Sequence, residues 1–266
     1  MTNANNNDIK EVQRKLEHEL KDQLIADPSE KSFQEAYDKI HKFFEENENA
    51  ESLYPERLKW FSKIFIDLCG SGNRILDIGT GNGKLAIAMA KKGNIVTGMD
   101  ISKIALQKAK EMHKKNAPDL PVDFKFGDAR KLPFEDGTFN YITSQDLVEH
   151  ISENDFKIHL NEVYRVLKPG GRYVFWTPSE LRGGSSLGLH LKEYTIDEMD
   201  TIIKNTMFKY SWFDLRFYRL KMKIEIKQSM MYPVILYERF LSKIIKLVPG
   251  PLNQLLVPRL FFQLTK

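Results

Sequence analysis

Residues 74–90 read RILDIGTGNGKLAIAMA, and this stretch decides the fold that the sequence predicts. An apolar run leads directly into a loop that contains Gly79, Gly81 and Gly83, and apolar residues then recur at helical spacing. Glycine permits a tight turn and lets the backbone approach a ligand closely. The first N–H groups of the following helix can face an anionic group. The stretch therefore predicts a strand, a ligand-binding loop and a helix.

The same alternation of strands and helices continues on the carboxyl-terminal side. The pattern predicts strands at 74–79, 95–100, 122–127, 139–144 and 171–177, a sixth strand within 206–219 and a seventh at the final RLFFQLTK. Helices are expected near 82–92, 102–116, 154–167 and 195–205. Apolar strands separated by helices predict an α/β fold with a doubly wound, mainly parallel seven-stranded sheet. Such sheets bind ligands beyond the carboxyl ends of their strands.

The pattern divides the chain into four segments. Residues 1–70 are expected to form an N-terminal helical cap, with a break between helices at Pro28-Ser29. Residues 71–219 form the predicted core, and residues 258–266 supply its final strand. Between the last two strands, residues 220–257 form an apolar and basic helical insertion.

Composition limits the classes of protein to consider. The chain has 266 residues and a single cysteine, Cys69, which excludes an internal disulfide and favours a reducing compartment. Its N-terminus is polar and it has no long apolar run, so we expect a cytoplasmic protein without a membrane span. Residues 201–266 hold 12 Lys+Arg against 3 Asp+Glu. This basic region indicates either an acidic partner or a solvated basic face.

The spacing of the glycine loop points to one cofactor class. Dinucleotide-binding loops have the pattern G-x-G-x-x-G, but Lys84 stands where the third glycine would be. The chain instead resembles class I S-adenosylmethionine-dependent methyltransferases, whose first motif D-x-G-x-G-x-G is matched by Asp77, Gly79, Gly81 and Gly83. The resemblance implies a Rossmann-like methyltransferase fold. It also implies that the loop, Thr80 included, wraps the methionine part of S-adenosyl-L-methionine.

Later motifs extend the resemblance to residues 74–178. Asp100 ends the second strand, where a carboxylate accepts hydrogen bonds from ribose hydroxyls, and Ile101 follows it. The resemblance makes Asp128 the partner of the adenine amino group and Ala129 a backbone N–H donor. The stretches LPFEDGTFNYITSQDLVEHI and EVYRVLKPGGRYVFWTP resemble the fourth- and fifth-strand regions of the family, with Pro169-Gly170-Gly171 expected as a turn before the fifth strand. In this topology Gln145 faces the cofactor.

Methyl transfer to a hydroxyl is helped by a general base, and histidine suits that role near neutral pH. His150 and His190 lie in predicted ligand-side loops and are the two candidates; each could equally be a surface or capping residue. The segment from Ser179 to Tyr194 is expected to act as a lid. Acceptor contacts are assigned to Asp146, Glu193 and Tyr194, and to Tyr37 of the cap. The reaction needs no metal. The other four histidines, His18, His41, His113 and His159, are predicted to be on the surface.

These features predict an enzyme that methylates a small-molecule or lipid-linked acceptor at oxygen and releases S-adenosyl-L-homocysteine. Residues 144–147 lack the N/D-P-P-Y/F sequence of base N-methyltransferases, so no DNA partner is expected. The apolar and basic stretch 230–247 could be a lid, a dimer contact or a peripheral membrane contact. Two alternatives remain: an RNA or protein methyltransferase that uses the basic C-terminal region, and a cofactor-binding regulatory protein without turnover.

Overall fold

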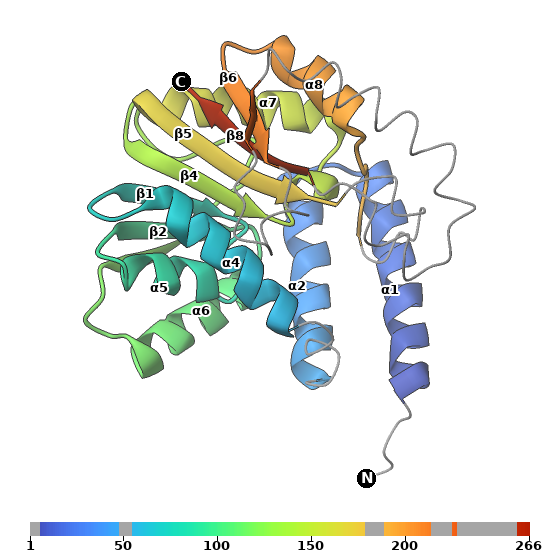
Figure 1. Ribbon diagram of the computed structural model, residues 1–266. Coiled ribbons are helices and arrows are strands. Elements are labelled where there is room, and N and C mark those ends of the chain that lie inside the picture. Colours follow the sequence, from blue (N-terminus) through green and yellow to red (C-terminus); the bar gives the residue numbers. More distant parts are fainter. Residues whose placement is uncertain (1–5, 48–54, 179–188, 214–224, 228–259) are drawn as a thin grey trace. The chain divides into compact units, whose positions relative to one another are not determined.

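The computed structural model describes residues 6–47, 55–178, 189–213, 225–227 and 260–266 (Figure 1). The chain divides into two compact units. The first comprises Met1–Lys131 with Leu187–Leu191, and the second comprises Leu132–Ser186 with Lys192–Lys266. Most of the predicted insertion, including the stretch 230–247, lies outside the described residues, as do positions 179–188 of the predicted lid.

Among its described residues, the first unit contains N-terminal helices and a parallel three-stranded sheet. Its helices are α1 (Asn6–Ala26), α2 (Glu30–Glu46), α4 (Pro55–Cys69), α5 (Lys84–Ala90) and α6 (Lys103–Asn116). Its strands are β1 (Arg74–Ile78), β2 (Ile95–Asp100) and β3 (Val122–Phe126). β2 pairs in parallel with both β1 and β3. Helices α1 and α2 lie side by side, as Figure 1 shows, and the break between them falls at the predicted Pro28-Ser29.

In the part of the second unit that the structure describes, there are five strands and three helical segments. Its strands are β4 (Phe139–Gln145), β5 (Leu167–Thr177), β6 (Lys209–Phe213), β7 (Glu225–Lys227) and β8 (Leu260–Thr265). Its helical segments are η1 (Val148–His150), α7 (Glu153–Val166) and α8 (Ile196–Lys204). β4 and β5 are parallel, whereas β8 is antiparallel to both β5 and β6.

The order of strands in the sheet is β3-β2-β1-β4-β5-β8-β6-β7. This order confirms the predicted doubly wound, mainly parallel α/β fold. The short strand β7, antiparallel to β6, was not predicted and adds an eighth strand. Its three residues lie inside the segment that the pattern assigned to a helical insertion.

Local signals explain where the helices begin. Ser29, Ser102 and Ser152 each place a side-chain oxygen on a backbone N–H three residues later, at the starts of α2, α6 and α7. Thr195 begins α8 with a reciprocal pair of bonds, in which its hydroxyl accepts from the Glu198 N–H and the Glu198 carboxylate accepts from the Thr195 N–H. Such caps satisfy N–H groups that have no partner inside the helix.

β5 differs from the prediction at its start. The strand begins at Leu167, immediately after α7, rather than at Gly171. Gly170 has a φ of 75°, and the register of β4 against β5 shifts between Phe139 and Tyr141. The Pro-Gly-Gly sequence therefore forms an irregularity within the strand, which its glycines permit.

The surface assignment of His159 was wrong. Its side chain on α7 is fully buried, and its Nε2 lies 3.0 Å from the hydroxyl of Tyr173. The same hydroxyl lies 2.6 Å from Oγ of Ser144. These contacts give the buried imidazole a hydrogen-bond partner, which a polar group in an apolar interior requires. The helical spacing of His159 could not reveal it, because Tyr173 lies on another element.

Glu149 is a buried acid in the second unit. Its side chain in η1 has no exposed surface, and Oε2 accepts a hydrogen bond of 2.9 Å from Oγ1 of Thr177. Oε1 has no hydrogen-bond partner among the described residues. Burial and the nearby negative charge of Asp146 raise the pKa of the Glu149 carboxyl well above its ordinary value.

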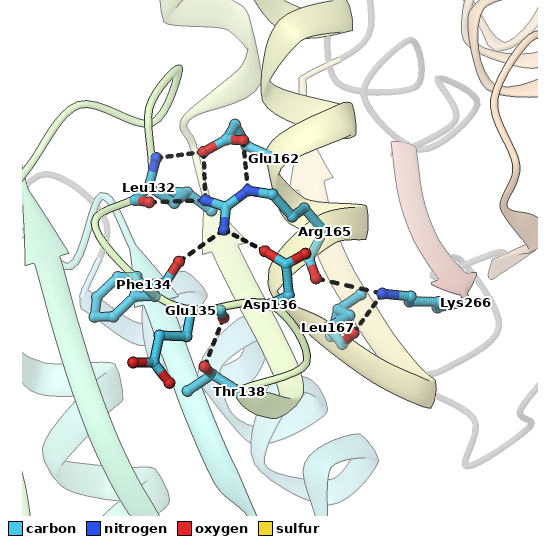
Figure 2. Close-up of polar contacts among 9 residues, drawn as sticks. All are labelled: Leu132, Phe134, Glu135, Asp136, Thr138, Glu162, Arg165, Leu167 and Lys266. Atoms are coloured by element: carbon cyan, nitrogen blue, oxygen red, sulfur yellow. Dashed lines mark hydrogen bonds and ion pairs between the residues drawn. The ribbon is translucent and has the colours of Figure 1, made fainter.

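Arg165 fastens the segment before β4 to helix α7 (Figure 2). Its guanidinium donates to the carbonyls of Leu132 and Phe134 at 2.9 and 2.7 Å, and to the carboxylates of Glu162 and Asp136 at 2.8 Å. Glu162 in turn accepts from the Leu132 N–H at 2.8 Å. These bonds hold the residues that lead into β4, because one planar fork reaches two carbonyls and two carboxylates.

Across the described residues, no helix is both long enough and apolar enough to span a bilayer.

The first prediction concerns Arg165. We expect Arg165→Lys to lower the free energy of unfolding by about 1–3 kcal/mol, because a lysine cannot reproduce the planar set of donors. Arg172, which is exposed on β5, provides the control. Arg172→Lys should change the unfolding free energy by less than about 0.5 kcal/mol. Urea unfolding of the two variants measures both values, and equal effects would contradict the role of Arg165.

The second prediction concerns Glu149. Because its pKa is raised in the folded protein, the unfolded chain loses this proton first as pH rises. Glu149 should therefore reduce stability from about pH 4 upward, by at most about 1.4 kcal/mol per pH unit, until the pH passes its folded pKa. Glu149→Gln should remove this decline. Denaturant unfolding of the wild type and of Glu149→Gln over a pH series measures this difference. If the free energy of unfolding changed with pH in the same way in both proteins, the prediction would be wrong.

Candidate functional site

The glycine loop between β1 and α5 has the backbone conformation that its sequence predicts. Gly79, Gly81 and Gly83 have φ values of 70°, 54° and 76°, which side-chain-bearing residues rarely adopt. A Cβ on Gly83 would also lie 2.8 Å from the ring of Phe124. Thr80 donates its hydroxyl to Asp77 at 2.8 Å, which fixes the start of the loop. The loop is thus shaped by its own residues at the carboxyl end of β1.

Asp100 lies at the carboxyl end of β2, in direct contact with this loop. The Gly81 N–H donates to Oδ2 of Asp100 at 2.8 Å, and the Ser102 N–H donates to Oδ1 at 2.9 Å. Burial raises the pKa of the Asp100 carboxyl, while these two N–H groups and the charge of His41 act in the opposite direction. A carboxylate has about four lone-pair positions, so Asp100 can still accept hydrogen bonds from a ligand.

Asp128 follows β3 and is held by Arg130. The Arg130 side chain donates to both carboxylate oxygens, with Nε at 3.0 and 2.9 Å and Nη2 at 2.6 Å. The Arg130 backbone N–H donates to Oδ1 at 2.8 Å. Ala129 is buried beside it. The Gly127 N–H donates to the carbonyl of Asp100 at 3.1 Å, so this segment adjoins the end of β2.

The structure therefore groups the predicted cofactor residues of the first unit at one end of three parallel strands. They are Asp77, Gly79, Thr80, Gly81, Gly83, Asp100, Ile101, Asp128 and Ala129. These are the carboxyl ends of β1, β2 and β3, where doubly wound sheets bind their ligands. Tyr37 is half-buried on α2 of the same unit and lies parallel to Phe33, with a distance of 6.4 Å between ring centroids.

The second unit gathers several predicted residues near the end of β4. Gln145 ends that strand, and Asp146 follows it with a φ of 52°, the only positive φ of a residue other than glycine in the described chain. His150 is half-buried in η1. The backbone N–H of Lys192 donates to the carbonyl of Glu149 at 3.1 Å. This bond brings the segment that contains Glu193 and Tyr194 to η1.

Two of the acceptor-side candidates differ in exposure. Glu193 is half-buried, whereas Tyr194 is fully buried and its ring lies 5.7 Å from that of Phe156. The Tyr194 hydroxyl is also buried and has no hydrogen-bond partner among the described residues. His190 is half-buried and belongs to the first unit, so the two candidate bases fall in different units.

Sequence reasoning missed two residues of these clusters. Arg130 lies two residues after Asp128. Many exposed ion pairs have this spacing, so it does not by itself indicate a residue of a binding site. Glu149 stands directly before His150, and the available signal was an acid directly after the apolar pair Leu147-Val148, near the end of a strand. Its burial depends on Thr177 of β5, which the local sequence does not identify.

Comparisons with known proteins match the core of the chain. Residues 75–171 match the model of a methyltransferase domain family. The chain is 37% identical over 103 residues to 27-O-demethylrifamycin SV methyltransferase of Amycolatopsis mediterranei, which covers 38% of this chain and 37% of that protein. It is 33% identical over 142 residues to demethylmenaquinone methyltransferase of Staphylococcus aureus, which covers 52% and 56%. The chain thus spans about half or less of the length of these relatives.

A solved structure supports the fold. The crystal structure of the [4+2]-cyclase SpnF matches with a TM-score of 0.53 and 21% identity, over 77% of this chain and 78% of that one. At this identity the likeness concerns the fold alone, and that neighbour is described as a cyclase. The type of domain therefore rests on the family match and on the motifs of the first unit. Residues 75–171 of this chain are a methyltransferase domain of the class I, S-adenosylmethionine-dependent type.

Proposed function

We propose that the whole chain is an S-adenosylmethionine-dependent methyltransferase that acts on a small-molecule or lipid-linked acceptor at oxygen. The observation that carries the proposal is the contact between the glycine loop and Asp100, in which the Gly81 N–H binds the buried carboxylate at 2.8 Å. It joins the loop that would hold the methionine part of the cofactor to the acid that would bind its ribose.

The geometry of the first unit fits this cofactor. Gly79, Thr80, Gly81 and Gly83 would surround the methionine carboxylate and ammonium, with Asp77 fixing the loop through Thr80. Asp100 would accept from the ribose hydroxyls beside Ile101. At the adenine, Asp128 and Ala129 are the proposed partners. Gln145 is proposed as a further cofactor contact from the end of β4.

When bound, S-adenosylmethionine supplies a methyl group on a positively charged sulfur. The acceptor oxygen would form a bond to that carbon, the bond from carbon to sulfur would break with its electron pair staying on sulfur, and the acceptor proton would leave. The protein therefore has to align the acceptor and take up its proton. His150 and His190 are the proposed bases, and Asp146, Glu193, Tyr194 and Tyr37 the proposed acceptor contacts.

The choice of a small acceptor rests on the relatives. The two relatives described above are named for rifamycin and demethylmenaquinone, both small molecules. The basic C-terminal region, with its 12 Lys+Arg in residues 201–266, is the feature that favours RNA or protein instead. Turnover with methyl-labelled S-adenosylmethionine on demethylmenaquinone, a metabolite and lipid extract, total RNA and a protein extract separates these classes. Label only in RNA or in protein would refute a small acceptor, and label in no fraction would favour the regulatory alternative.

The third prediction concerns cofactor affinity. We expect calorimetry to show binding of S-adenosyl-L-homocysteine and none of NAD. Asp100→Ala should weaken that binding by about 1–3 kcal/mol, because hydrogen bonds to a charged group are lost. Asp123, exposed on β3, supplies the control: Asp123→Ala should leave the affinity nearly unchanged. Tight binding of NAD without binding of S-adenosyl-L-homocysteine would refute the proposed cofactor site.

The fourth prediction separates the two candidate bases. If His190 accepts the proton, His190→Ala should lower kcat roughly 100-fold or more while the affinity for S-adenosylmethionine stays nearly constant. His150→Ala should have this effect only if the base lies after β4. Steady-state kinetics on the acceptor found by the labelling experiment measures both. Full turnover in both variants would show that alignment alone drives transfer.

A further inference from the structure

Helix α2 belongs to the N-terminal cap, yet it bonds directly to the segment that carries Asp100. The Asp38 carboxylate on α2 accepts a hydrogen bond of 2.6 Å from Oγ of Ser102 and one of 3.1 Å from the N–H of Ile104. Ser102 is fully buried, and its own N–H donates to Asp100. A continuous chain of hydrogen bonds therefore runs from Asp38 through Ser102 and Asp100 to Gly81 of the glycine loop.

A second connection joins the start of α2 to Asp128. Arg130, which binds both oxygens of the Asp128 carboxylate, also donates from Nη1 to the carbonyl of Pro28 at 2.7 Å. Its guanidinium carbon lies 4.6 Å from the centre of the Phe33 ring on α2. The arginine thus uses its planar fork on the acid, its remaining donor on the turn before α2, and its face on an aromatic ring.

These two connections share a property that cap packing alone does not require. A helix that only covers apolar surface can do so with apolar contacts, as α2 does through Ile40 and Ala36. Here two polar bridges end on the two carboxylates to which the proposed function gives the ribose and the adenine. They link positions 64 and 102 residues apart in the chain. His41, one turn after Asp38, acts to lower the pKa of Asp100 against the effect of burial.

We propose that α2 supports the cofactor site. Asp38 on this helix and Arg130, which contacts it, are positioning residues that hold Asp100 and Asp128 in their binding geometry. The proposal rests on the proposed cofactor roles of those two acids. Because coupling between two binding events is reciprocal, cofactor binding must then strengthen the docking of α2, just as docking of α2 strengthens cofactor binding. Helix α2 and the proposed cofactor site are then coupled to each other.

The first measurement is the affinity for S-adenosyl-L-homocysteine by calorimetry. Asp38→Ala and Arg130→Met should each weaken binding roughly 10-fold or more, because each removes hydrogen bonds to a charged group. Asp38→Asn keeps an acceptor oxygen for Ser102 and should recover part of the loss. The matched controls are Glu35→Ala, exposed on the same helix, and Lys131→Met, exposed next to Arg130. Both controls should bind as the wild type does.

The second measurement begins with the wild-type chain, so its main result does not depend on the folding of any variant. Amide hydrogen exchange in residues 30–46 is followed with and without saturating S-adenosyl-L-homocysteine. The exchange should slow on binding, and the slowing should be lost in Asp38→Ala. Failure of the wild type to bind the compound would refute the proposed function itself. Normal wild-type binding with unchanged affinity in both variants, or with no slowing in α2, would overturn the coupling alone.

Discussion

The carboxylate of Asp100 accepts hydrogen bonds from Gly81 on one side and Ser102 on the other, inside a region from which water is largely excluded. A buried carboxylate is costly unless such donors satisfy it. This requirement fixes the glycine loop against the end of β2 and aligns the start of α6. Through Ser102 it also determines where Asp38, and with it α2, can dock. The first unit is therefore organised around one acid.

Features encoded by neighbouring residues could be predicted from the sequence. The positive φ of Gly79, Gly81 and Gly83 follows from the residue type and the close turn. The caps at Ser102 and Ser152, which we did not predict, also have a local signal, because each hydroxyl lies three residues before a backbone N–H that has no partner inside the helix. Helix and strand positions also followed, because apolar spacing reflects which face is buried. The order of strands agreed with the predicted doubly wound topology.

Features that depend on a partner elsewhere in the chain could not be predicted. His159 was predicted to be on the surface because it lies in a helical stretch, but Tyr173 on β5 gives it a buried partner. β5 begins at Leu167 because its irregular start can still pair with β4. Arg130 reaches back to Pro28, and no local pattern relates those two positions. In each case a tertiary contact determines the structure, and the local sequence pattern does not reveal that contact.

Glu149 accepts hydrogen bonds from both ends of the chain segment that connects β5 to α8. Its side chain accepts from Thr177, and its backbone carbonyl accepts from Lys192. The two ends of the intervening stretch are thus tied to a single residue, whatever that stretch contains. Doubling the length of a closed loop adds only about 0.6 kcal/mol of entropy cost. A change in the length of the chain between Thr177 and Lys192 therefore costs little free energy, as long as both residues keep their contacts with Glu149.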